Sequence, residues 1–190
     1  YPIQVIHNGI DVTTFNPMQT SKLDLGLKEK FVILGVANVW SQRKGMRDFI
    51  LLHEKLSDEY VIVLVGLDEK QIKHLPEGIV GIKRTNSVQE LAAYYSASDV
   101  FLNPTWEDNF PTTNLEALSC GTPVITYRTG GSIEAVDNNT GFIVEQGDIN
   151  AVVNIVKLMK ETGKQQWISG CRERAVGLYD KRERYEEYLR

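Results

Sequence analysis

The chain alternates between short apolar runs and longer amphipathic stretches. Residues 31–37 and 60–66 are β-branched, almost wholly apolar runs of the length expected for strands covered on both faces. Further strands are predicted at residues 79–82, 100–102, 122–127 and 142–144. Amphipathic stretches predict helices at residues 46–56, 89–96, 112–119, 132–136 and 149–162. These repeated units predict an α/β fold, a doubly wound, Rossmann-like parallel sheet of about six strands flanked by helices.

The two ends of the chain depart from this pattern. Residues 1–6 have the pattern of a last strand of a preceding unit, closed by a turn at His7, Asn8 and Gly9. We therefore expect residues 1–15 to be an interdomain linker or the end of an N-terminal domain, and residues 16–190 to form one domain. From residue 164 onward the chain has the pattern of a polar, helical C-terminal tail, which is expected to lie against another surface.

Length, charge and cysteine content narrow the class of protein. A chain of 190 residues can bury roughly 70% of the surface that its unfolded form exposes, which suffices for one domain. The formal net charge of −4, without a dense Lys and Arg run, argues against nucleic acid or an anionic membrane as the main partner. No apolar run reaches the ~20 residues of a membrane span. Cys120 and Cys171 lack metal-ligand spacing, which favours reduced thiols in a cytosolic protein.

The loop after the first predicted strand carries no common nucleotide signature. Residues 35–41 lack the glycines of a dinucleotide-binding loop and the ending of a P-loop, and Asn38 and Trp40 stand where a phosphoryl-receiver domain has acidic residues. Arg43 and Lys44 follow, just before a predicted helix. Two cations beside the unpaired N–H groups of a helix start suit a diphosphate that gains charge as its bond breaks. The alternative is a solvated basic loop.

The turn after the predicted strand at residues 99–103 offers a stronger candidate site. It contains Glu107, Asp108, Asn109 and Phe110. Pro111 suits the first position of the next helix and leaves the N–H groups of Thr112 and Thr113 free for an anion. Glu116 lies on the same helix face as Thr112, where a carboxylate can accept hydrogen bonds from vicinal sugar hydroxyls. The alternative for Glu116 is an ordinary surface position.

A glycine pair completes the candidate motifs. Gly130 and Gly131, before Glu134, predict either a close approach of the backbone to a ligand or a flexible turn. Together the motifs resemble the C-terminal, donor-binding half of a GT-B fold glycosyltransferase of the retaining family 4, over nearly the whole chain. The matching parts are His7-Asn8-Gly9-Ile10-Asp11 with Phe15 as the interdomain entry, Arg43-Lys44-Gly45 as the phosphate loop, and Asp108-Asn109-Phe110-Pro111, residues 115–124 and Gly130-Gly131 with Glu134 as the donor signature.

This resemblance implies roles for the candidate residues. Arg43 and Lys44 would hold the donor diphosphate, and Glu116 the nucleotide ribose. The backbone of residues 110–113, namely Phe110, Pro111, Thr112 and Thr113, would hold the phosphates or the donor sugar. Family members often have an Arg after the glycine of the first strand, and here Arg43 would supply that charge.

The acidic turn departs from the family pattern. The family usually has Glu two positions before the Phe, whereas this chain has Asp108 there and Glu107 one residue earlier. Both stay candidates for the donor site together with Asn109, and we predict that Asp108, not Glu107, faces the donor sugar. Lys44 and Asp108 are then the expected catalytic residues.

The implied function is that of a retaining hexosyltransferase. It would move a sugar from a nucleoside-diphosphate sugar to a hydroxyl acceptor through an oxocarbenium-like transition state, in polysaccharide or glycoconjugate synthesis, with no cofactor and no metal. The expected partners are the donor, an N-terminal acceptor domain of the same polypeptide and an acceptor sugar or glycolipid, and no nucleic acid. We expect a cytoplasmic protein. If it associates with the inner face of a membrane, we expect the N-terminal domain to make that contact. The isolated chain is expected to be inactive.

Two other functions stay open. A sugar-nucleotide epimerase with the same two-domain architecture would present the same donor motifs, and so would a nucleotide-binding module without catalysis. The sequence names neither the sugar, the base nor the acceptor. The upstream half, where the acceptor site is expected, would distinguish these possibilities.

Overall fold

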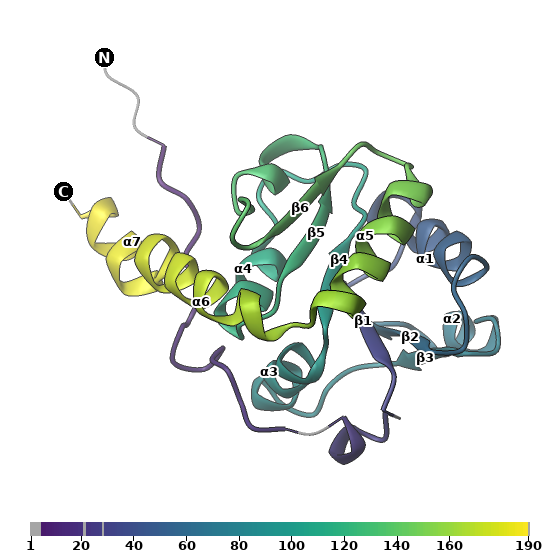
Figure 1. Cartoon of the computed structure of the whole chain (residues 1–190). Helices are drawn as coiled ribbons and strands as arrows, with labels where there is room; N and C mark the ends of the chain where they lie inside the picture. Colours follow the sequence, from purple (N-terminus) through teal and green to yellow (C-terminus); the bar gives the residue numbers. More distant parts are fainter. Residues whose placement is uncertain (1–4, 21, 28, 190) are drawn as a thin grey trace.

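A parallel sheet forms the centre of the computed structural model, which describes residues 5–20, 22–27 and 29–189 (Figure 1). Within these residues six strands pair in the order β3-β2-β1-β4-β5-β6, and every pairing is parallel. The strands are β1 (Phe31–Val36), β2 (Tyr60–Val65), β3 (Ile79–Ile82), β4 (Val100–Asn103), β5 (Val124–Tyr127) and β6 (Gly141–Val144). The predicted doubly wound α/β sheet is confirmed.

Helices cover both faces of the sheet because successive strand side chains point to opposite sides. Val32 and Leu34 of β1 pack in one hydrophobic cluster, with side chains from α3, α4 and α6, while Ile33 packs in the other, with side chains from α1 and α5. The helices are α1 (Met46–His53), α2 (Glu69–Lys73), α3 (Val88–Ala97), α4 (Thr112–Ser119), α5 (Ile149–Thr162), α6 (Gln165–Tyr179) and α7 (Lys181–Tyr188). Short 3₁₀ turns are η1 (Leu23–Leu25), η2 (Gln42–Lys44) and η3 (Gly130–Ile133). In the described part of the chain, no helix combines the length and apolarity needed to cross a membrane.

Most predicted elements are found, and a few differ from the prediction in type or in length. Helices α4 and α5 begin and end where the pattern predicts. The predicted helix at residues 132–136 is instead the turn η3, and the predicted helix at residues 46–56 ends at His53. The short helix α2 was not predicted, although Asp68 and Gln71 form a capping box at its start. Of the strand predicted at residues 1–6, residues 1–4 lie outside the described residues, and residues 5 and 6 are in no strand.

The N-terminal segment is fastened to the last two helices. Ile10, Val12 and Phe15 are buried in the core. The N–H of Ile10 donates to the carbonyl oxygen of Tyr179 at 2.7 Å. The guanidinium of Arg172 donates to the carbonyl oxygens of Val12 and Phe15, both at 2.9 Å. Residues 10–15 therefore pack on the domain beside α6 and α7, as the purple and yellow segments of Figure 1 show.

A buried lysine fixes the start of α6. Lys164 Nζ donates to the carbonyl oxygens of Ser96 and Ser98, both at 2.7 Å, and to Thr122 Oγ1 at 2.8 Å. Burial lowers the pKa of Lys164 to about 8, because the ammonium loses its hydration. The same side chain satisfies carbonyl groups at the end of α3, so it ties α6 to the layer that α3 and α4 form.

Both cysteines should be unreactive in the folded protein. Cys120 and Cys171 are buried, and burial raises the pKa of each thiol to about 12. At pH 8 the thiolate fraction is then lowered by roughly three orders of magnitude relative to a thiol with a pKa near 9. We expect the native protein to react with a disulfide reagent such as DTNB far more slowly than the protein in guanidinium, where both thiols should titrate at once. Fast stoichiometric labelling of the native protein would contradict this burial.

Candidate functional site

A cavity of about 410 Å³ lies where the strand order reverses. Successive strands run outward from β1 in one direction and from β4 in the other, so the carboxyl ends of these neighbours flank a crevice. The cavity is lined by residues 36–40, 43–44, 102–104, 108 and 110–113. It therefore joins the loop after β1, the loop after β4 and the beginning of α4.

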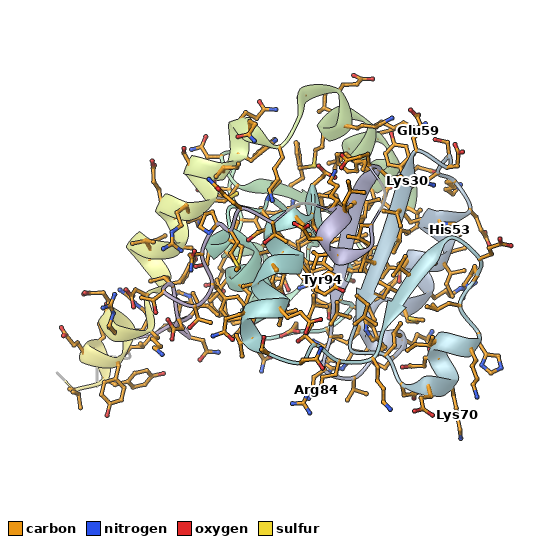
Figure 2. All side chains as sticks on the ribbon, turned by 90° about the horizontal axis from the view of Figure 1, so that it is seen from below. Lys30, His53, Glu59, Lys70, Arg84 and Tyr94 are labelled. Carbon is orange, nitrogen blue, oxygen red and sulfur yellow. The ribbon has the colours of Figure 1, made fainter. Side chains whose placement is uncertain are left out.

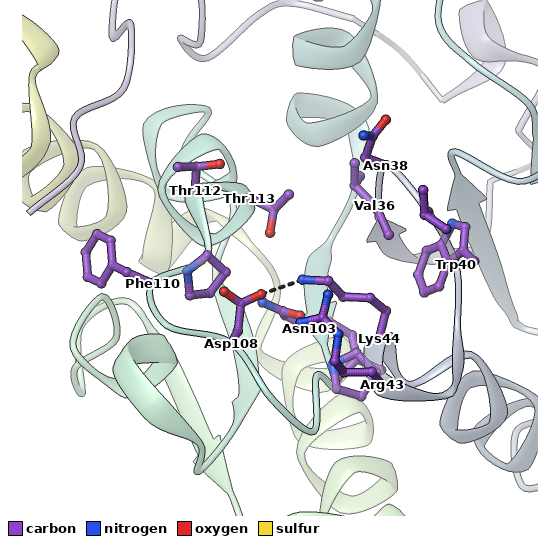
Figure 3. Close-up of a pocket in the computed structure, with 15 residues that line it drawn as sticks. Val36, Asn38, Trp40, Arg43, Lys44, Asn103, Asp108, Phe110, Thr112 and Thr113 are labelled. Atoms are coloured by element: carbon purple, nitrogen blue, oxygen red, sulfur yellow. Dashed lines mark hydrogen bonds and ion pairs between the residues drawn. The ribbon is translucent and has the colours of Figure 1, made fainter.

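An ion pair crosses the cavity wall (Figure 3). The ammonium of Lys44, at the end of η2, donates to the carboxylate of Asp108, which follows β4. The two side chains are 25% and 16% exposed, so both are largely withdrawn from water yet reachable from the cavity. An ammonium has three N–H donors, and this bond uses one of them. The remaining donors can meet an anionic ligand.

Backbone contacts of Arg43 hold the two loops in register. Its carbonyl oxygen accepts from the backbone N–H of Trp106 at 2.8 Å and from Thr105 Oγ1 at 3.3 Å. Its guanidinium donates to the carbonyl oxygen of Glu107 at 2.9 Å. Because η2 is bonded in this way to the loop after β4, Lys44 is held within reach of its partner.

The start of α4 supplies a second group of hydrogen-bond donors. The helix begins at Thr112, and Pro111 is the N-cap residue with an extended backbone, one position earlier than predicted. In the described structure no side chain caps this helix. Its first N–H groups therefore have no intrahelical acceptor and carry the positive end of the helix dipole. Thr112 and Thr113 line the cavity, so this end can receive an anion.

Three predicted site residues are not among those that line this cavity. Glu107 lines a neighbouring cavity, and Asn109 is exposed, with its carbonyl oxygen accepting from Gly131 N–H at 2.8 Å. The carboxylate of Glu116 accepts a hydrogen bond from the hydroxyl of Tyr95 on α3 at 2.8 Å. Burial raises the pKa of Glu116, partly offset by this bond. By contrast Arg43, Lys44, Asp108 and Phe110 to Thr113 all line this one cavity.

The glycine pair approaches the protein's own acidic turn. A Cβ added to Gly130 would lie 1.9 Å from the carbonyl oxygen of Asp108, and one added to Gly131 would lie 2.1 Å from that of Asn109. The two glycines therefore approach the backbone of the protein itself, and a close approach to a ligand stays a prediction. Any side chain at either glycine would push the turn that carries Asp108.

Glu134 and His7 form a second polar group beside this turn. His7 Nε2 lies 2.6 Å from the carboxylate of Glu134 and donates to it. The His7 ring also packs on Phe110, with centroids 4.7 Å apart. Neither His7 nor Glu134 is among the residues that line the cavity, although His7 packs on Phe110, which does line it.

Two buried polar residues, one in the site and one beside it, were not predicted. Asn103, at the end of β4, lines the cavity and donates from Nδ2 to Asn114 Oδ1 at 2.8 Å. The sequence pattern could have indicated Asn103, since a polar residue at the carboxyl end of a strand, beside the point where the strand order reverses, is expected to face a ligand. Asp48 of α1 accepts from Trp106 Nε1 at 2.9 Å and from the hydroxyl of Tyr127 at 2.8 Å. Burial and this carboxylate both raise the pKa of Tyr127.

Comparison with known families identifies the class of protein. The model of the family "Glycosyl transferases group 1" matches residues 30–161. This span includes the whole cavity and all six strands of the sheet. The chain therefore belongs to the glycosyl transferases group 1 family, and the predicted resemblance is confirmed.

Curated relatives are longer than this chain. It is 28% identical over 169 residues to D-inositol 3-phosphate glycosyltransferase of Corynebacterium jeikeium, which covers 77% of this chain and 40% of the relative. It is 27% identical over 195 residues to UDP-Gal:alpha-D-GlcNAc-diphosphoundecaprenol alpha-1,3-galactosyltransferase of Escherichia coli, covering 94% of this chain and 50% of the relative. The chain thus spans half or less of the length of these two relatives.

Solved structures share the fold. Anabaena HepE, solved in complex with UDP, has a TM-score of 0.85 and 21% identity, and the match covers 98% of this chain and 56% of that one. The C-terminal domain of LpcC from Francisella tularensis has a TM-score of 0.73 and 19% identity, and the match covers 90% of this chain and 99% of that one. The fold is that of a C-terminal GT-B domain.

The burial of Glu116 predicts a pH-dependent stability. Because the folded-state pKa of Glu116 is raised, its contribution to stability is full below the unfolded value near 4.5 and is lost as the pH rises through the folded value. Glu116→Gln removes this ionisation and keeps an acceptor for Tyr95. We expect the variant to be at least as stable as the parent in guanidinium unfolding at pH 7, with its advantage gone at pH 4. An equal loss of stability at both pH values would contradict the burial of a charged group here.

Proposed function

We propose that this chain is the donor-binding half of a retaining glycosyltransferase that takes its sugar from a nucleoside-diphosphate sugar. The observation that carries the proposal is the cavity at the reversal of strand order, where Lys44 and the open start of α4 both face one space. A diphosphate presents several oxygens along one chain, so it can meet an ammonium and a helix N-terminus at once. Family membership supports sugar transfer as the reaction.

The charges of the site fit the leaving group. Bond cleavage leaves negative charge on the departing diphosphate, and donors fixed before the reaction stabilise that charge. We assign this role to Lys44, to Arg43 at the cavity rim and to the N–H groups of Thr112 and Thr113, without a metal. The departing phosphate then serves as the base for the acceptor hydroxyl on the same face, with no covalent enzyme intermediate, and the configuration is retained.

Asp108 has a double role in this proposal. Its carboxylate holds Lys44 in place before the donor arrives, and it lies on the side of the cavity where the donor sugar would sit. Glu116 would reach the ribose from one turn further along α4, exchanging its bond with Tyr95 for one with a hydroxyl. Glu107 and Asn109 would support the turn from outside the cavity.

The acceptor belongs to the rest of a longer protein in this proposal. Residues 1–15 would connect the donor domain, residues 16–190, to an N-terminal domain that carries the acceptor, a sugar or a glycolipid. The E. coli relative is named for a lipid-linked acceptor, and HepE was solved with UDP and with UDP-glucose. Uridine nucleotides are therefore suitable probes. The isolated chain should bind the donor and transfer no sugar, because half of the cleft would be absent.

Lys44→Ala should weaken nucleotide binding. The wild-type chain is titrated with UDP, GDP and ADP by calorimetry. The nucleotide that binds most tightly is then titrated into the variants. Loss of one charge-assisted hydrogen bond should cost about 1.5–3 kcal/mol, roughly ten- to a hundredfold in affinity. Lys70→Ala is the matched control, since Lys70 points away from the domain surface (Figure 2) and should change nothing.

Two results would contradict the proposed function. Failure of all three nucleotides to bind would remove the nucleotide donor. If a folded Lys44→Ala variant bound the nucleotide with unchanged affinity, Lys44 would be only a structural partner of Asp108. Circular dichroism spectra and unfolding midpoints would establish that the variants are folded.

Asp108→Asn and Glu107→Gln should differ in their effect on the sugar. The quantity measured is the ratio of affinities for UDP-glucose and UDP, since this ratio isolates contacts with the sugar. Weakening one hydrogen bond to a sugar hydroxyl should change the ratio by about threefold or more in Asp108→Asn. Glu107→Gln should leave the ratio as it is in the parent. The opposite ranking would show that the longer side chain of Glu107 reaches the sugar.

A further inference from the structure

A second cavity, of about 610 Å³, lies beside the first and has no role in the proposed function. Arg43 lines both cavities and separates them. The other walls come from η2 and α1, from the loop after β4, and from Gly147, two residues before α5. We call this space the Trp106 cavity; the lining residues used below are Arg43, Arg47, Asp48, Trp106 and Glu107.

The indole of Trp106 is exposed but firmly held. Its Nε1 donates to the buried carboxyl of Asp48 at 2.9 Å, and its ring packs edge to face on Tyr127, with centroids 6.0 Å apart. Its carbonyl oxygen accepts from Thr129 Oγ1 at 3.0 Å and from Gln146 Nε2 at 2.7 Å. Even so, 44% of the residue is exposed. A large apolar face is therefore presented in one fixed orientation, which lowers the entropy cost of stacking a ligand on it.

The polar groups around the indole balance in charge. Among the described residues that line the cavity, Arg43 and Arg47 carry guanidinium groups, while Asp48 and Glu107 carry carboxyl groups. One guanidinium N–H of Arg43 is already used on the carbonyl oxygen of Glu107. A polyanion would meet the exposed carboxylate of Glu107 as well as the cations, and the buried charge of Asp48 lies nearby, so phosphate chains and sulfated ligands would gain little affinity here. A neutral ligand with many hydroxyls can use both the donors and the acceptors.

We infer that the Trp106 cavity binds one ring of a neutral saccharide. A pyranose ring has an apolar face of C–H groups that stacks on an indole, and an equatorial rim of hydroxyls that both donate and accept. Arg47 and Glu107 are exposed and line the same cavity, so they offer a donor and an acceptor to this rim. Arg43 lines both cavities, so the ring would lie next to the donor cavity. The inference goes beyond the proposed function, because saccharide binding here requires no nucleotide in the first cavity.

The three tryptophans of the chain allow a direct test. Each gives one indole N–H signal in a nitrogen-15 correlation spectrum, and Trp106→Phe assigns the signal of Trp106. The wild-type chain is titrated with maltohexaose and with cellohexaose, which are neutral and differ in linkage. We expect one of them to shift the Trp106 signal saturably with a Kd on the order of millimolar. The signal of Trp40, whose indole donates to Val65 inside the fold, should stay in place.

A variant at the rim of the Trp106 cavity gives a second test of saccharide binding. Arg47→Ala removes an exposed guanidinium and should weaken the saccharide titration by about three- to tenfold, the loss of one hydrogen bond. Arg84→Ala is the control, since Arg84 is exposed at a distant edge of the domain (Figure 2) and should leave the titration unchanged. Neither variant should alter binding of the nucleotide that the donor cavity prefers.

Three outcomes would overturn the inference. The Trp106 signal could stay in place with both neutral hexasaccharides, or all three indole signals could shift together. Alternatively, a sulfated heparin hexasaccharide could bind more tightly than the neutral ones, which would make the cavity an anion site. Since nucleotide binding is measured separately, failure of the saccharide inference and failure of the proposed function give different results.

Discussion

The site depends on the bond between two loops that the sheet topology alone would leave apart. Right-handed connections carry the chain away from β1 on one side and away from β4 on the other, which opens a crevice between their ends. The backbone of Arg43 closes the base of this crevice by accepting from Trp106, and its guanidinium bonds to Glu107. Without that contact, η2 would be an ordinary surface turn, and the ion pair of Lys44 and Asp108 would have no fixed geometry.

The ion pair of Lys44 and Asp108 contributes more to the orientation of these two side chains than to the stability of the fold. Two partly buried charges lose hydration, and their mutual attraction offsets much of this cost without a large net gain. Their value lies in orientation, because an ammonium held by one oxygen keeps its other donors aimed into the cavity. The same reasoning applies to Asp48, a buried carboxyl whose two hydrogen-bond partners, Trp106 and Tyr127, come from the loop after β4 and from β5.

Backbone packing links the remaining motifs to the same turn. The glycine pair at 130–131 lies against the carbonyl groups of Asp108 and Asn109, and Phe110 is covered by His7. A change in the N-terminal segment or in η3 would therefore move the acidic turn even though neither touches the cavity. In this way residues far from the ion pair share in setting its position, since packed backbone transmits displacement directly.

Hydrophobic periodicity by itself determined the strands, the parallel sheet and the limits of α4 and α5, because burial on both faces requires unbroken apolar runs in strands and a 3.6-residue stripe in helices. The expectation that Lys44, Asp108 and the start of α4 serve one site came from the family resemblance, and in the structure they line one cavity. The turn η3 was mistaken for a helix, because its glycines serve a contact with a loop about 20 residues earlier, which no local pattern contains. The bonds from Tyr95 to Glu116 and from Trp106 to Asp48 were decided only by the tertiary structure. Side chains that meet across layers are 21 and 58 residues apart in the chain, and which of them meet is fixed by how the helices pack on the sheet.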